Sequence, residues 1–113
     1  MFVAVFVRRL REGKTYADFL EAWYPDKGFG VSGRGPITAR SLDDEREILT
    51  VGFVDLSSRE KLSDAMARLA DQEAVRHDRL GEVIESTVLR AIYEQLDEFD
   101  FSSDESVAAG RPW

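Results

Sequence analysis

His77 and two arginines, Arg40 and Arg90, are the side chains of this sequence best suited to acid–base or anion chemistry. His77 is the one histidine, and because imidazole titrates nearest to neutral pH it is the first candidate for a general base. Each arginine stands among apolar residues of an expected strand, where a guanidinium pairs with an acid, reaches solvent or binds an anion. If the chain is an enzyme, we expect His77 and Arg40 to be catalytic. An exposed helical His77 and arginines paired with nearby acids are the plainer alternatives.

Aromatic residues that could hold a ligand gather around the end of the first expected helix. Trp23 and Tyr24 close that helix, Phe29 stands in the loop that follows, and Tyr93 ends the last expected strand. Aromatic side chains offer large apolar contact areas, and tryptophan and tyrosine add a polar group. Together with Arg90, these four residues are expected to bind a small apolar or aromatic ligand. Packing in the core and at its rim is the alternative for Trp23 and Tyr24.

The segment from Gly28 to Gly33, GFGVSG, matches the G-x-G-x-x-G pattern of dinucleotide-binding proteins. That function needs a strand before the glycines and a helix after them, so that the pyrophosphate meets the helix N-terminus. Here an expected helix precedes the glycines, and Gly35-Pro36 and a strand follow them. We therefore expect a flexible crossover loop, or a lid over a pocket, and no dinucleotide.

The absence of cysteine and the single histidine restrict the chemistry further. Without cysteine the chain can form no disulfide and has no thiolate nucleophile, and one histidine disfavours a zinc site built within one chain. We therefore expect no metal site.

Charge is distributed unevenly, with 15 basic and 22 acidic residues overall and six acids without a base between residues 94 and 105. The rest of the chain is nearly balanced, so no basic face emerges and nucleic acid is not expected as a partner. Arg8, Arg9, Arg11 and Lys14 cluster beyond the first expected strand, and we interpret them as solvated charge. The N-terminus is apolar first and basic after, the reverse of a secretory signal, and its apolar run is too short to cross a bilayer. A cytoplasmic protein without a membrane segment is expected.

The apolar patterns predict strand, helix, strand, strand, helix and strand, in that order. The expected strands are 2–7, 37–42, 46–55 and 87–93; the first helix runs over 16–24, and the second follows Ser57 and continues or restarts at 73–79. Thr15 with Asp18, and Ser57 with Glu60, have the spacing of helix-capping boxes. This order predicts an α+β, ferredoxin-like βαββαβ fold, a four-stranded antiparallel sheet with two helices on one face.

The first and third expected strands, FVAVFV and ILTVGFV, are apolar on both faces, whereas the helices cover one face. If Phe2, Ala4 and Phe6 face the helices, Val3, Val5 and Val7 would face water on a monomer, and the reverse assignment of the two faces leads to the same conclusion. A second sheet packed on the first would bury them, so we expect a homodimer through the sheet faces, a dimeric α/β barrel. The domain is expected to span residues 1–95, with residues 96–113 as an acidic tail.

This pattern over residues 1–95 resembles the dimeric α/β-barrel superfamily, which includes antibiotic-biosynthesis monooxygenase-like, EthD-like and stress-responsive barrel proteins. Phe19 and Trp23 match the first part of the EthD-like pattern, but Asp26 or Lys27 stands where a histidine would follow. The superfamily also includes haem-degrading monooxygenases, which need an asparagine in the pocket, and this chain contains no asparagine. The resemblance implies a small-molecule-binding dimer, either a cofactor-independent monooxygenase or an isomerase or cyclase acting on an aromatic or lactone-like substrate. A non-catalytic stress-response or protein-interaction dimer is the alternative.

Overall fold

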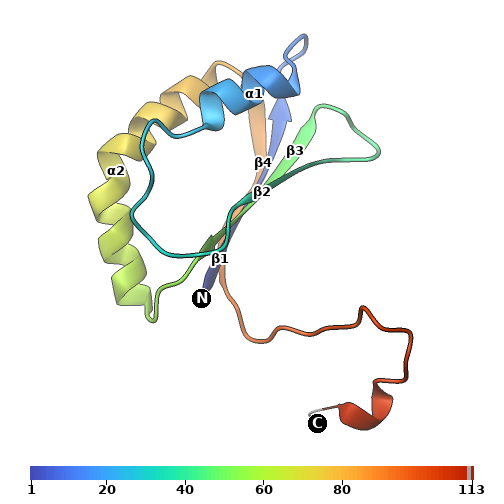
Figure 1. The fold of residues 1–113 in the computed structure, drawn as a ribbon. Helices are drawn as coiled ribbons and strands as arrows, with labels where there is room; N and C mark the ends of the chain where they lie inside the picture. The colour runs from blue at the N-terminus through green and yellow to red at the C-terminus, as the bar shows by residue number, and fades with distance from the viewer. Residues whose placement is uncertain (112) are drawn as a thin grey trace.

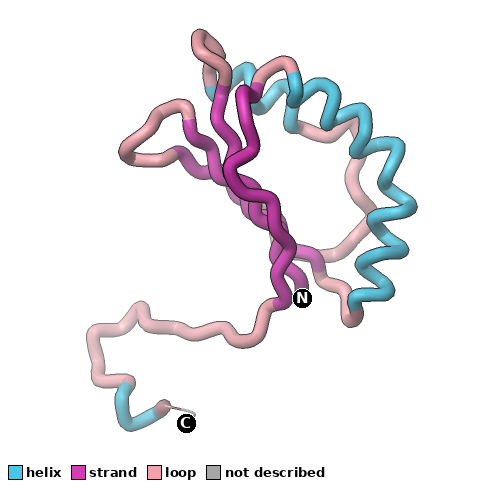
Figure 2. Tube along the Cα trace, turned by 180° about the vertical axis from the view of Figure 1, so that it is seen from behind, coloured by secondary structure: helices cyan, strands magenta, loops and turns pink. Residues whose placement is uncertain are grey.

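The computed structural model describes residues 1–111 and 113. Within them the elements are β1 (Phe2–Leu10), α1 (Tyr16–Trp23), β2 (Ile37–Arg40), β3 (Glu47–Val54), α2 (Arg59–Gly81), β4 (Ile84–Glu94) and a 3-10 turn (Ala108–Gly110). The strands form one antiparallel sheet in the order β2-β3-β1-β4. Both α-helices lie on one face of it (Figures 1 and 2). The predicted ferredoxin-like α+β fold is confirmed.

Local sequence signals explain where the helices begin and end. Thr15 caps α1, because its Oγ1 accepts from Asp18 N at 3.2 Å while its own N–H donates to the Asp18 carboxylate at 2.8 Å. Pro25 follows directly after the cap at Tyr24, so the helix stops there. The expected cap of α2 was one residue early: Ser58, and not Ser57, accepts from Lys61 N at 3.2 Å. From there α2 runs unbroken to Gly81.

The sheet presents two different faces. On β1 the side chains of Phe2, Arg8 and Leu10 turn toward the helices, and all three are buried. The opposite face carries Val3, Val5 and Val7 of β1, paired with Phe53, Val51 and Leu49 of β3. We call this second side the open face, because neither α1 nor α2 covers it (Figure 2).

The apolar core lies at one end of the molecule, where α1 and the C-terminal half of α2 meet the sheet. It comprises Leu10, Phe19, Ala22, Ile48, Leu80 and Val83. Phe19 and Ile48 are 0% exposed. The rings of Tyr16, Phe19 and Trp23 stack along α1, with successive centroids 6.2 and 6.1 Å apart. The N-terminal half of α2 extends beyond this core and over the rest of the sheet (Figure 1).

β1 is longer than expected, and its extension corrects the interpretation of the basic cluster. The strand continues through Arg8 and Arg9 to Leu10, pairing Arg8 with Ile48 of β3 and Thr87 of β4. Arg8 is 8% exposed, so the expectation of solvated charge is wrong for this residue. It follows Phe2, Ala4 and Phe6 at intervals of two, and therefore lies on the helix-covered face.

After β4 the chain leaves the body of the molecule. Gln95 N still donates to Met1 O at 2.9 Å, and the following residues extend away from the sheet (Figure 1). Leu96 and Phe101 are 85% and 69% exposed. Residue 112 of the expected tail lies outside the described residues.

Candidate functional site

The helix-covered face of the sheet has a floor of small residues beneath α2. Ala4 of β1 and Gly52 of β3 are register partners at its centre. A methyl group placed at Gly52 would find its nearest neighbour atom, Ala4 Cβ, 3.9 Å away. Both residues stay partly exposed although the helices cover this face. Solvent therefore reaches the strip of sheet that Ala4 and Gly52 form, and we call this strip the groove.

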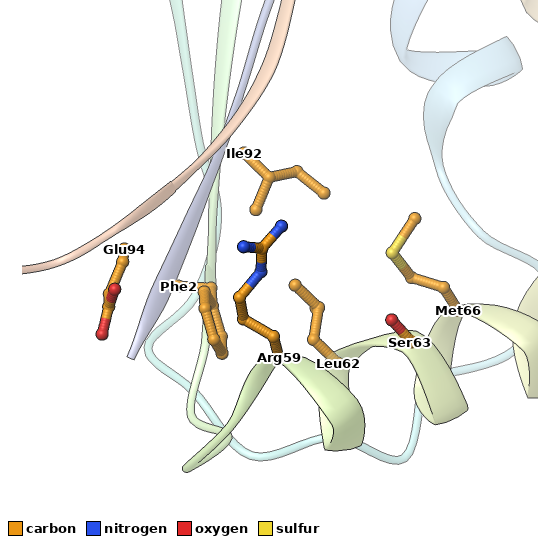
Figure 3. Close-up of a pocket in the computed structure, with 7 residues that line it drawn as sticks. All are labelled: Phe2, Arg59, Leu62, Ser63, Met66, Ile92 and Glu94. Atoms are coloured by element: carbon orange, nitrogen blue, oxygen red, sulfur yellow. The ribbon is translucent and has the colours of Figure 1, made fainter.

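A cavity of about 470 Å³ opens at the end of the groove near the start of α2 (Figure 3). Its lining comes from the sheet (Phe2, Ile92 and Glu94) and from α2 (Arg59, Leu62, Ser63 and Met66). The Arg59 side chain reaches from the helix toward Ile92 and lies beside Leu62 (Figure 3). The volume falls within the range of roughly 300–1,000 Å³ that is usual for small-molecule sites.

Arg8 lies farther along the same face of the sheet, and this charged side chain is buried. Its Nη1 donates to Thr50 Oγ1 at 3.2 Å, and its guanidinium lies over the Phe6 ring, 4.3 Å from the centroid. Burial lowers the pKa of Arg8 to about 10, and the positive charges of Arg76 and Arg90 add to this effect. Arg8 therefore stands in a positively charged and poorly solvated environment.

Arg76 of α2 belongs to the same cluster and connects it to the aromatic residues. Its Nη1 donates to both carboxylate oxygens of Glu73, at 2.7 and 2.8 Å. Its guanidinium carbon lies 5.8 Å from the Trp23 ring centroid and 5.2 Å from that of Phe29. The Glu73 carboxylate, whose negative charge raises the pKa of Arg8, is thus already bound to Arg76.

The segment after α1 runs beside α2, and α2 side chains bind it through hydrogen bonds (Figure 1). Four α2 side chains donate to carbonyl oxygens of residues 23–29: Arg76 to Trp23 (2.8 Å), Arg79 to Tyr24 (3.1 Å), Gln72 to Lys27 (2.7 Å) and Arg68 to Phe29 (2.8 Å). Farther on, Asp55 N donates to Ser32 O at 2.7 Å. A side chain at Gly33 would place its Cβ 2.2 Å from Phe53 O, so only glycine allows this approach. The expected crossover loop is thus attached to α2 and to the end of β3.

Three of the residues selected from the sequence meet in this region. Trp23 and Phe29 lie around the Arg76 guanidinium. Arg90 of β4 pairs with Phe6, whose ring lies beneath Arg8. The positive charge of Arg90 helps to lower the pKa of Arg8.

The other four lie elsewhere. Arg40 is at the outer strand β2, over the Tyr16 ring at 5.6 Å, beside a shallow hollow of about 220 Å³. His77 is exposed on α2. Tyr24 is 68% exposed, and Tyr93 pairs with Val3 on the open face.

Sequence reasoning missed Arg8 and Arg76, and a usable signal existed for each. Arg8 follows Phe2, Ala4 and Phe6 at intervals of two, so a strand extended by a few residues would have placed it on the same face as these three residues. Arg68, Gln72 and Arg76 recur every four residues, which puts them on one side of a helix. Their acceptors are backbone carbonyls at the end of α1 and in the loop after it, which no side-chain pattern reveals.

Within residues 1–111 and 113, no group of three or more His, Asp or Glu side chains is placed to hold a metal ion. Over the same residues, no helix has the length and apolar character needed to cross a membrane.

No protein-family model and no curated protein sequence matches the chain. Among solved structures, it is similar to one from Chloroflexus aurantiacus J-10-fl named as a "putative Antibiotic biosynthesis monooxygenase", with a TM-score of 0.63 and 11% sequence identity. The two proteins share a fold. The match covers 88% of this chain and 96% of the other, and at this identity it establishes the fold alone. The resemblance predicted from the order of elements is confirmed at that level.

Proposed function

We propose that this protein binds a small aromatic molecule in the groove between α2 and the sheet. The observation that carries the proposal is the pairing of Ala4 with Gly52 beneath a helix, with the cavity at one end and Arg8 at the other. Two small residues at the centre of a covered sheet bury less apolar surface than larger side chains would bury there. A ligand occupying the groove would supply that burial instead.

The printed name of the structurally similar protein suggests a monooxygenase. We extend the proposal to the oxygenation of a phenol without a bound cofactor, because the aromatic residues and the arginines suit an aromatic anion. In such a reaction a phenol and dioxygen give a quinone and water: one oxygen atom enters the ring and the other leaves as water. The deprotonated substrate supplies the electrons, and a guanidinium stabilises its oxyanion. Arg90 and Arg8 would take this role, with Trp23 and Phe29 packing against the ring. Isomerisation of a lactone-like substrate would use the same groove.

Oxygen consumption tests the catalytic part of the proposal. The purified protein is mixed with 1-naphthol or a related hydroxyarene, without added metal or flavin, and dissolved oxygen is recorded. Turnover that falls at least tenfold in the Arg90→Met variant is the expected result. If naphthalene derivatives bind but no oxygen is consumed, the proposed oxygenase activity is refuted and the proposed small-molecule binding stands.

A homodimer through the open face forms part of the proposal. Leu89 and Tyr93 of β4 are 40% and 52% exposed on that face, and Ile37 of β2 is 47% exposed. Such a contiguous apolar surface is typical of an interface between copies.

A protein-interaction dimer is the second candidate, and the tail favours it. Phe99 and Phe101 stack on each other, with centroids 5.7 Å apart, and remain 54% and 69% exposed among acidic residues. Removing residues 96–113 separates the two functions. Small-molecule binding should survive the truncation, whereas capture of a protein partner by the tail should not.

A further inference from the structure

We propose that Arg8 and Arg90 form a receptor for a carboxylate at the inner end of the groove, and that the apolar body of the same ligand lies over Ala4 and Gly52. The inference rests on the proposed function, because it names the class of ligand that the groove would take. That class is an aromatic monocarboxylate; a substrate of the proposed oxygenation would carry its phenolic hydroxyl beside the carboxylate, so that the same two arginines face both groups.

The first argument is the charge of the cluster. Arg8 is 8% exposed and Arg76 9%, and Arg90 lies close enough to repel Arg8. Three guanidinium groups thus stand against one carboxylate, that of Glu73, which binds Arg76 through both oxygens. A buried charge without an opposite partner is costly, and a bound anion would remove that cost.

The second argument is the unused hydrogen-bonding capacity of Arg8. Its side chain contacts the Thr50 hydroxyl and the Phe6 ring, and neither is an anion. Among the described residues, side-chain nitrogens sealed from solvent without a partner occur at Arg9 and Arg79. The remaining nitrogens of Arg8 therefore keep accessible surface, although the residue as a whole is buried. Donors of this kind can receive the two oxygens of a carboxylate.

The third argument is continuity with the cavity. Ile92, which lines the cavity, stands two residues from Arg90 on the same strand and on the same face. Ile92 pairs with Ala4, and Arg90 pairs with Phe6. A ligand lying along β1 and β4 would thus have its apolar body over Ala4 and its charged group at the arginines.

The surroundings favour a carboxylate on an apolar body over a free inorganic anion. The planar fork of a guanidinium matches the two oxygens of a carboxylate. Phe6, Trp23 and Phe29 supply aromatic surface close to the cluster. A hydrated phosphate would gain nothing from the small-residue floor.

Calorimetric titration of the full chain with 2-naphthoate and with uncharged 2-naphthamide tests the receptor. The wild type should bind the acid about 10- to 100-fold more tightly than the amide, as expected for charge-assisted hydrogen bonds. Arg8→Met should lose this preference and leave amide binding unchanged. Arg9→Met is the matched control, since it removes the neighbouring guanidinium on the other face of the same strand, and it should bind both as the wild type does.

The outcomes separate the receptor from the proposed function. Equal binding of acid and amide by the wild type, or an unchanged preference in Arg8→Met, would overturn the receptor and leave the groove as a binding site. No binding of either compound would overturn both. Inorganic phosphate that displaces naphthoate at equal concentration would overturn the choice of a carboxylate. If the Arg8→Met variant does not fold, the Arg90→Met variant replaces it, because Arg90 is exposed. This substitution should reduce the preference for the acid over the amide at least tenfold.

Discussion

Arg76 Nε donates a 2.8 Å hydrogen bond to the carbonyl oxygen of Trp23, the last residue of α1. The same guanidinium binds Glu73 and lies near the Trp23 and Phe29 rings. One side chain thus joins both helices and the loop after α1. The position of α2 over the sheet depends on such contacts, because the N-terminal half of α2 has little apolar core of its own.

Arg76→Met should destabilise the protein by about 2 kcal/mol, because it removes buried hydrogen bonds and releases the loop. Glu73 limits the loss, since its side chain is 47% exposed and can regain water. Arg68→Met is the matched control: it removes a similar bond, to Phe29 O, from an exposed position, and should cost less than about 1 kcal/mol. Urea denaturation of both variants measures the difference. Equal losses of unfolding free energy in the two variants would show that Arg76 contributes no more than the other hydrogen bonds between α2 and the loop.

The fold was predictable because its signals are local. Thr15 and Asp18 stand three residues apart, and their capping box forms as the spacing predicts. The period of two along β1 placed Val3, Val5 and Val7 together on one face, but because both faces of the strand are apolar the sequence did not decide which face the helices cover. The site was harder, because it depends on distant pairings. Arg8 is inside only because β1 continues beyond Val7 to pair with Ile48 and Thr87.

Gly52→Val should keep the fold and remove the function. The position has room for a larger side chain, and a β-branched residue suits a strand, so the free energy of unfolding should stay the same or rise by about 0.5–1 kcal/mol. The added methyl groups would occupy the groove, and binding of 2-naphthoate should weaken at least tenfold. Ala39→Val adds a similar volume on the exposed strand β2, and should leave binding unchanged. Retained binding in Gly52→Val would place the ligand elsewhere.

Asp18 gives the stability of α1 a pH dependence. The backbone N–H and the hydroxyl of Thr15 both donate to its carboxylate, and they lower the pKa of Asp18 below its usual 3.8. A carboxyl with a lowered pKa in the folded state stabilises the protein above the unfolded value, and this contribution is lost as the pH falls through the folded value. Unfolding midpoints of wild type and Asp18→Asn should therefore differ near pH 6 and converge near pH 2. A constant difference across that range would exclude ionisation of Asp18 as the cause.

Val5→Lys should convert the proposed homodimer into a monomer. Val5 stands at the centre of the open face, between Val51 of β3 and Ala91 of β4. A lysine there would bring two like charges into the middle of a sheet-to-sheet interface without acidic partners, and the cost of burying them exceeds what the lost apolar contacts supplied. Light scattering after size-exclusion chromatography at 10–100 µM, on the order of concentrations where interfaces of standard size associate, should report twice the chain mass for wild type and the chain mass for Val5→Lys. Val75→Lys makes the same exchange on α2, where the valine is 53% exposed, and should remain dimeric. A monomeric wild type would instead mean that the open face meets a different partner or remains in water.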